Sequence, residues 1–222
     1  MCFSATVSYS SAAVLVSTGA YAFRLARRMQ SPYWLLWALV PVFFGVQQGL
    51  EGLVWQQLEA GNTVGAVPYA LGFHFFSHFL WLWWLPLCSY LVEPGNIRRK
   101  IIAGCAMLGA FSGTLVYTVM LLHPEWMSVS VRQFSILYTF SVPFRGPFHL
   151  PITPAALYAL IVLVPLFSSS HRLIVIFGGL VALSMVLASE AYGYAYVSVW
   201  CFFAAVLSLY LVFMIHRFIN KK

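Results

Sequence analysis

The side chains best suited to chemistry in this sequence are Glu51, His74 and His78. All three stand inside long apolar segments, where an ionisable group costs at least about 2.5 kcal/mol and therefore needs a reason. His74 and His78 are four residues apart, so in a helix they share one face. Two such imidazoles and a carboxylate are a recognised ligand set for zinc or another divalent ion. We therefore predict a metal site formed by these three residues.

Further polar and aromatic residues accompany the three on the same predicted helix faces. Gln47 and Trp55 lie one turn to either side of the glutamate, and Gln48 adjoins them. Ser77 and Trp81 share the face of the two histidines. We predict that Gln47, Gln48, Trp55 and Trp81 line a binding site, and that Ser77 is a catalytic or oxyanion-stabilising donor, with Gln48 as a second such donor.

The predicted ligands also match in depth. At a rise of 1.5 Å per residue, Glu51 lies about 9 Å below the outer end of its helix, and His74 about 10 Å below the outer end of the next. A short loop joins these helices, so we expect them to be antiparallel neighbours whose polar groups meet in the outer half of the membrane. Two other interpretations stay open: a functional polar network without metal, and a network that only holds the helices together.

Other groups on the outer side are expected to complete the site. His123 and His149 belong to a long outer loop, Glu190 follows the sixth apolar segment, and Cys2 lies near the beginning of the chain. Carboxylates and imidazoles are the usual general acids and bases. We therefore predict Glu190 or His149 as the catalytic base.

The composition defines the kind of molecule that carries these residues. The 222 residues are 62% apolar and only 8% charged, with a mean hydropathy of +0.86. A soluble domain carries about 25% charged residues, whereas long uncharged blocks are typical of bilayer-spanning helices. We predict an all-α integral membrane protein with a single transmembrane domain, residues 1–222, and a bundle of seven helices. The apolar segments are 3–23, 33–57, 67–91, 101–122, 152–167, 173–189 and 196–215.

The basic residues predict how this bundle is oriented. Ten of the twelve lysines and arginines fall on alternate loops, and only Arg132 and Arg145 fall on the others. Positive charge stays in the cytoplasm during insertion, so we expect the N-terminus outside and the C-terminus in the cytoplasm. The net charge of +7 is therefore a sign of topology. It does not indicate a nucleic-acid partner, and the expected partner is membrane lipid.

The outer loop, residues 123–151, is long enough to have a structure of its own. Residues 128–132 alternate polar and apolar side chains, as an amphipathic strand would. One interpretation is a lid or short hairpin over the outer mouth of the bundle. The other is an interfacial loop whose Phe144 and Phe148 enter the headgroup region.

Two local patterns concern packing. Gly109 and Gly113 have the spacing that lets helix backbones approach closely, which predicts tight contacts inside the bundle. Glu93, near the inner boundary, is expected to pair with Arg98 or Arg99.

Several motifs together resemble a bacterial family of small multi-pass membrane proteins of unknown function. The resemblance is best over the first three helices and implies no activity. We expect the chain in the inner (plasma) membrane of a bacterium. The resemblance rests on the opening Met1-Cys2-Phe3-Ser4-Ala5, on Phe44-Gly45-Val46-Gln47-Gln48 followed by Glu51-Gly52 and Trp55, and on Phe76-Ser77-His78 with Trp81.

These observations favour a metal-dependent enzyme, with zinc or another divalent ion as cofactor. A bound divalent ion lowers the pKa of its water and polarises a carbonyl or phosphoryl group, so we expect a hydrolase acting on a lipid or amphiphile at the outer leaflet. The alternative is a transporter or sensor that binds a metal ion, a proton or a small solute in an outward-facing polar pocket. A third interpretation is a subunit whose polar core is structural. The oligomeric state is not predicted.

Overall fold

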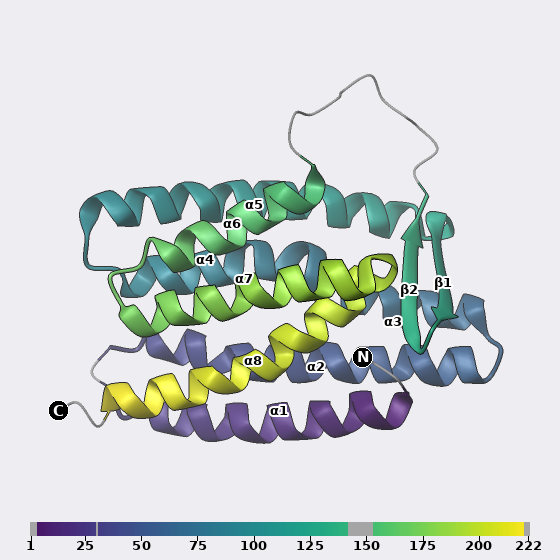
Figure 1. Ribbon diagram of the computed structural model, residues 1–222, viewed down its shortest axis with the longest axis horizontal. Helices are drawn as coiled ribbons and strands as arrows, with labels where there is room; N and C mark the ends of the chain where they lie inside the picture. The colour runs from purple at the N-terminus through teal and green to yellow at the C-terminus, as the bar shows by residue number, and fades with distance from the viewer. Residues whose placement is uncertain (1–3, 30, 142–152, 220–222) are drawn as a thin grey trace.

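A computed structural model describes residues 4–29, 31–141 and 153–219 of the chain (Figure 1). Each of the seven predicted apolar segments is helical, and the third is one continuous rod, residues 63–92, that contains a π-helical segment, η1. The elements are α1 (Ala5–Ala26), α2 (Trp34–Glu59), α3 (Thr63–His74), η1 (Phe75–Leu80), α4 (Trp81–Val92), α5 (Asn96–Leu122), η2 (Pro124–Trp126), β1 (Met127–Arg132), β2 (Ser135–Phe140), α6 (Pro154–Phe167), α7 (Arg172–Tyr192), η3 (Gly193–Ala195) and α8 (Tyr196–Ile219).

Among the described residues, four helices are long and apolar enough to cross a membrane. They are the rod 63–92, α5, α7 and α8, and α6 is a shorter apolar helix. α1 and α2 fall outside this set, and α2 contains two glutamates and four glutamines along its length. α2 packs against α1, α3 and α8, and its Gln47, Gln48 and Glu51 are fully buried. These three polar residues of α2 therefore face protein, as expected of polar groups in a membrane bundle.

The stretch 127–140 forms an antiparallel hairpin that lies across one end of the bundle (Figure 1). Met127 and Val129 of β1 are buried, whereas Ser128 and Ser130 between them are exposed. The alternation in the sequence therefore predicted a strand correctly, and its buried side covers an apolar cluster over α2 and α3. We call this end of the molecule the hairpin end. Phe144, Phe148 and Arg145 lie outside the described residues.

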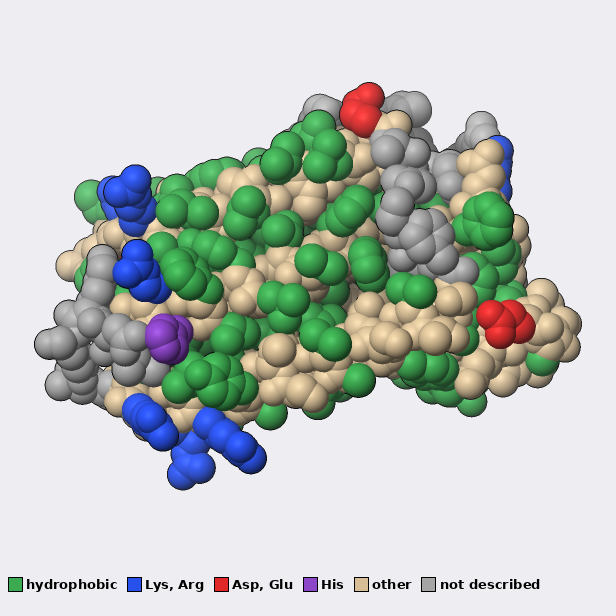
Figure 2. Space-filling view, turned by 60° about the horizontal axis from the view of Figure 1, so that its bottom comes forward, with side chains coloured by type: hydrophobic (Ala, Val, Ile, Leu, Met, Phe, Trp, Pro, Cys, Tyr) green, Lys and Arg blue, Asp and Glu red, His purple; other side chains and the backbone are tan. Residues whose placement is uncertain are grey.

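At the opposite end, the loop after α4 is fastened to the loop after α6. The Glu93 carboxylate accepts hydrogen bonds from the Ser170 hydroxyl (2.5 Å), the Ser170 amide (2.7 Å) and the Gly95 amide (3.1 Å). Arg98 donates to the Ser170 hydroxyl at 2.9 Å. The expected ion pair of Glu93 with Arg98 or Arg99 is therefore wrong, because backbone amides and a hydroxyl occupy the carboxylate. We call this end the basic end, since most of the lysines and arginines on view gather there (Figure 2).

Gly109 and Gly113 form the seam between α5 and the rod 63–92. A Cβ atom on Gly109 would overlap the carbonyl oxygen of Leu82, and one on Gly113 would lie 3.1 Å from that of His78. The small residues thus let α5 approach the backbone of η1 and α4, as their spacing predicted. The position of η1 depends on this contact.

We predict that Gly109→Ala destabilises the protein by about 1–3 kcal/mol, because α5 must move away from α4. The matched control is Gly104→Ala on the same helix, where an added Cβ meets nothing within 4 Å. That variant should be neutral or more stable by up to about 1 kcal/mol, because alanine favours helix. Reversible unfolding in detergent micelles measures the free energy of unfolding of both variants. Equal effects of the two variants would contradict the assigned seam.

A second prediction concerns pH. Burial by itself raises the pKa of Glu93, but the hydrogen bonds from Ser170 and Gly95 outweigh it and hold this pKa below its ordinary value of 4.5. The ionised Glu93 carboxylate therefore stabilises the folded protein fully above pH 4.5. This stabilisation is lost as the pH falls through the lower pKa that Glu93 has in the folded state. The melting temperature of the wild type should exceed that of Glu93→Gln at pH 7, and the gap should close toward pH 3. Glu59→Gln, at an exposed carboxylate, should show no such gap.

Candidate functional site

The site begins in the π-helical segment. His74 is the last residue of α3, and Ser77 and His78 lie in η1. π-Helical turns are rare, and they occur frequently at functional sites. Gly113 of α5 supports this segment from one side, close to the carbonyl oxygen of His78.

The polar atoms of these three side chains form a small triangle. The two Nδ1 atoms of His74 and His78 are 3.0 Å apart, and the Ser77 Oγ lies 3.2 Å from the first and 2.9 Å from the second. With neutral rings, one Nδ1–H can donate to the serine oxygen while the serine hydroxyl donates to the other Nδ1. We call these three residues the His–Ser cluster.

The two histidines differ in their surroundings. His74 is 3% exposed, and its ring meets that of Tyr138 edge to face at 4.7 Å. Tyr138 belongs to strand β2 and also stacks on Phe73, so the hairpin covers the cluster from the hairpin end. His78 is half-buried and borders a cavity. Tyr138 has no local sequence signal for this position, because an aromatic residue in a strand is ordinary.

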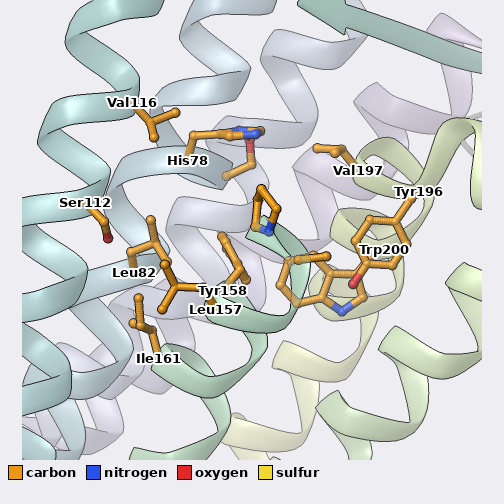
Figure 3. A pocket seen from close by; sticks show the side chains of 13 residues that line it. His78, Leu82, Ser112, Val116, Leu157, Tyr158, Ile161, Tyr196, Val197 and Trp200 are labelled. Atoms are coloured by element: carbon orange, nitrogen blue, oxygen red, sulfur yellow. The ribbon is translucent and has the colours of Figure 1, made fainter. Parts of the chain in front are cut away.

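The cavity has a volume of about 300 Å³ and lies between the rod 63–92, α5, α6 and α8. Figure 3 shows the His78 imidazole on one side of it and the rings of Tyr196 and Trp200 on another. Ser112 also borders it, but its hydroxyl donates to the Leu108 carbonyl of its own helix. Ser77 borders it beside His78, and the remaining side chains of the wall are aliphatic or aromatic. They are Leu82, Val116, Pro154, Ala155, Leu157, Tyr158, Ile161 and Val197.

Behind the cluster, Gln47 joins three helical segments through its amide. Its Oε1 accepts from the Trp81 indole at 3.0 Å, and its Nε2 donates to the Phe73 carbonyl at 3.5 Å and to the Cys201 sulfur at 3.4 Å. The Trp81 ring in turn stacks on Phe44 at 4.1 Å. Gln47 and Trp81 therefore position α3, α4 and α8 around the site, and neither borders the cavity described above.

Glu51 lies one turn away on α2, fully buried. Its carboxylate accepts hydrogen bonds from the Ser198 hydroxyl at 2.6 Å and from the Gln48 amide at 3.1 Å. Among the described residues, no group of three histidine, cysteine, aspartate or glutamate side chains is placed to hold a metal ion. The structure therefore does not bring Glu51, His74 and His78 together as one set of metal ligands. The carboxylate is engaged by α2 and α8, while the imidazoles meet each other and Ser77.

The other predicted residues separate into different regions. Trp55 is buried in the apolar cluster beneath the hairpin, and Glu190 is exposed on α7 and does not border the cavity. His123 pairs with Glu125 at 3.0 Å. His149 and Cys2 lie outside the described residues. Ser198 and Cys201, which sequence analysis did not assign to the site, share a face of α8 by their spacing of three.

These features define an α-helical membrane protein with a buried polar site beside an apolar cavity. Comparison with curated proteins and with solved structures finds no match. Residues 1–222 match the family of unknown function DUF6629, so the chain belongs to that family. The resemblance to an uncharacterised family is thereby confirmed over the whole chain.

The Gln47–Trp81 hydrogen bond gives a prediction. Trp81→Phe removes the donor from a buried amide oxygen, and Gln47→Leu removes the acceptor from a buried indole, so each should lower the free energy of unfolding by about 1–3 kcal/mol. The double variant should lose less than the sum, because neither partner is then left alone. Trp83→Phe is the control, since its indole nitrogen has no hydrogen-bond partner among the described residues. These free energies are measured by unfolding in detergent. If the loss in the double variant equals the sum of the two single losses, Gln47 and Trp81 are not coupled and the prediction is contradicted.

Proposed function

We propose that the protein is a membrane-embedded, metal-dependent hydrolase that acts on a lipid or another amphiphile in the outer half of the membrane. The supporting observation is the position of the His–Ser cluster, which borders an apolar cavity through Ser77 and His78. Ligand sites usually combine an apolar cavity with a few convergent polar groups. The hydrocarbon part of the substrate would occupy the cavity, and the bond to be cleaved would lie at the cluster.

The dimensions of the cluster suit a divalent ion. Ligands at 2.0–2.1 Å from a tetrahedral zinc ion are about 3.3 Å from one another. The three atoms of the cluster are 2.9–3.2 Å apart and can therefore form one face of such a tetrahedron after a small displacement. The proposed ligands are His74 Nδ1 and His78 Nδ1, with Ser77 Oγ or a water as the third. In this proposal Glu51 is not a ligand, and it acts by fixing Ser198 of α8.

The proposed reaction is hydrolysis of a carboxylic ester. An ion at the cluster would lower the pKa of its bound water and polarise the ester carbonyl. The water oxygen would add to the carbonyl carbon, and the bond from that carbon to the alcohol oxygen would break. One proton of the water would pass to the departing alcohol oxygen, and the other would remain with the acid. One water is consumed, and one acid and one alcohol are formed. Where a water is the third ligand, the Ser77 hydroxyl would donate a hydrogen bond to the developing oxyanion.

For the orientation in the membrane, we propose seven spans with the N-terminus outside and the C-terminus in the cytoplasm. The gathering of basic side chains at one end supports this assignment (Figure 2). The basic end would then face the cytoplasm of a bacterium, and the hairpin end would face out. The hairpin, with Tyr138 over His74, would serve as the lid of the site.

Metal analysis of the purified protein tests the proposal. The wild type should contain about one zinc or other divalent ion per chain, and His74→Ala and His78→Ala should lose it, because two neutral imidazoles are the main ligands. His123→Ala removes a histidine outside the cluster and should keep the ion. Hydrolysis of radiolabelled monooleoylglycerol in detergent micelles should follow the metal content and stop after chelation.

Three other results would contradict or change this proposal. A wild type without bound metal would end the metal-dependent version. Hydrolysis that survives chelation and is lost in Ser77→Ala would instead assign the serine as nucleophile and His78 as its base. Solute uptake by proteoliposomes, without hydrolysis of any ester tested, would favour the transporter.

A further inference from the structure

The cavity beside the His–Ser cluster has a floor where three helices meet. A Cβ atom on Gly109 of α5 would overlap the carbonyl oxygen of Leu82 and would lie 3.0 Å from the Cγ2 atom of Ile161 on α6. Leu82 is 6% exposed, and Ile161 is completely buried. Both side chains border the cavity, so this contact of α4, α5 and α6 closes it on the side of the basic end.

The opposite end of the cavity is a rim beside the cluster. Val116 of α5 and Pro154 and Ala155 of α6 border it there, and all three are exposed. In Figure 3 the His78 imidazole lies level with Val116, whereas Ile161 lies at the other end of the cavity. Pro154 and Ile161 are seven residues apart on α6, so the rim and the floor are separated by about 10 Å.

The wall between rim and floor suits a hydrocarbon chain. The described residues that border the cavity include no lysine, arginine, aspartate or glutamate, so a charged group there would have no partner. We propose that the cavity takes one acyl chain with its methyl end on the floor and its ester at the cluster, and that Leu82 and Ile161 limit the length of this chain. This inference rests on the proposed function and adds the length of the chain that the site accepts.

The volume gives the expected length. A cavity of about 150 Å³ holds a molecule of benzene, so one of about 300 Å³ holds about twice as many carbon atoms, roughly twelve. A shorter chain leaves contacts with the wall unmade, and a longer one must displace the floor. We therefore expect the best fit for chains of about 8 to 12 carbons. Monooleoylglycerol, whose chain is longer, should be a slower substrate than monodecanoylglycerol.

The dependence of binding on chain length tests this inference. The probes are 1-O-alkylglycerols, which have the headgroup and chain of a monoacylglycerol but no ester, so that their binding is independent of hydrolysis. Ethers of about 4 to 18 carbons are added at equal mole fraction to the protein in nanodiscs of dioleoylphosphatidylcholine, and the rise in melting temperature reports binding. The rise should be largest at about 8 to 12 carbons and less than half as large at either end of the series.

Two variants should move this optimum in opposite directions. Ser112 borders the cavity and is half-buried, so the ring of Ser112→Phe should fill about half of the space and lower the optimum to about 6 carbons. Ile161→Ala removes part of the floor and should raise the optimum by about 2 or 3 carbons. The matched controls are Thr114→Phe on α5 and Leu160→Ala on α6, at exposed positions that do not border the cavity. Both should keep the wild-type optimum.

The outcomes separate this inference from the proposed hydrolase. A rise in melting temperature that is equal for all chains, or that grows up to the longest chain, would overturn the inference, because the cavity would then set no limit. An optimum that stays unchanged in Ser112→Phe, or that moves as far in Thr114→Phe, would overturn it as well.

The same series with His78→Ala, where the proposed hydrolysis is absent, should still show an optimum, because the floor is unchanged. If the optimum is found but no monoacylglycerol is hydrolysed, the inference stands and the proposed function fails. If monoacylglycerols are hydrolysed and no optimum is found, the proposed function stands and the inference fails.

Discussion

The amide of Gln47 is the interaction on which the arrangement of the site depends. In the interior of a membrane bundle there is no water to satisfy a polar group, so each donor and acceptor must find a partner in the protein. Gln47 meets this requirement by using both ends of its amide on three partners, the Trp81 indole, the Phe73 carbonyl and the Cys201 sulfur. Phe73 precedes η1 in the chain, Trp81 follows it, and Cys201 lies on α8. One side chain therefore fixes where the π-helical segment and the last helix lie relative to α2.

The position of η1 is also restricted from the other side. Gly109 and Gly113 bring the backbone of α5 against the carbonyls of Leu82 and His78, where no larger residue fits without movement. The His–Ser cluster is thus held between a polar anchor on α2 and a close backbone contact on α5. Packing and chemistry are linked at this point, since a shift of α5 displaces the backbone of His78 and with it one edge of the cavity.

The sequence predicted the helices well because the length and polarity of apolar segments directly reflect the bilayer. It also predicted the strand at 128–132 and the glycine seam, which follow from local periodicity. It placed His74, Ser77 and His78 together correctly, since they belong to one helical rod. The sequence did not predict the partner of Glu51, because equal depths along two helices do not fix how each helix is rotated about its axis. Ser198, which holds that carboxylate, lies 147 residues away in the chain, so no local pattern connects them.

The polarity of the interior is concentrated on the side of the hairpin end. Toward the basic end, the described buried polar residues are few, and apart from Ser89 they bond to nearby groups. The Glu93 carboxylate is held there by Ser170 and Gly95, and the hydroxyl of Ser208, in the middle of α8, bonds to a carbonyl of its own helix. A path for a hydrated ion or solute needs polar groups free to replace its water, because an unsatisfied polar group in hydrocarbon costs several kcal/mol. Among the described residues, the cluster borders the cavity through Ser77 and His78, and this is why we propose a site reached from one side of the membrane rather than a pathway through it.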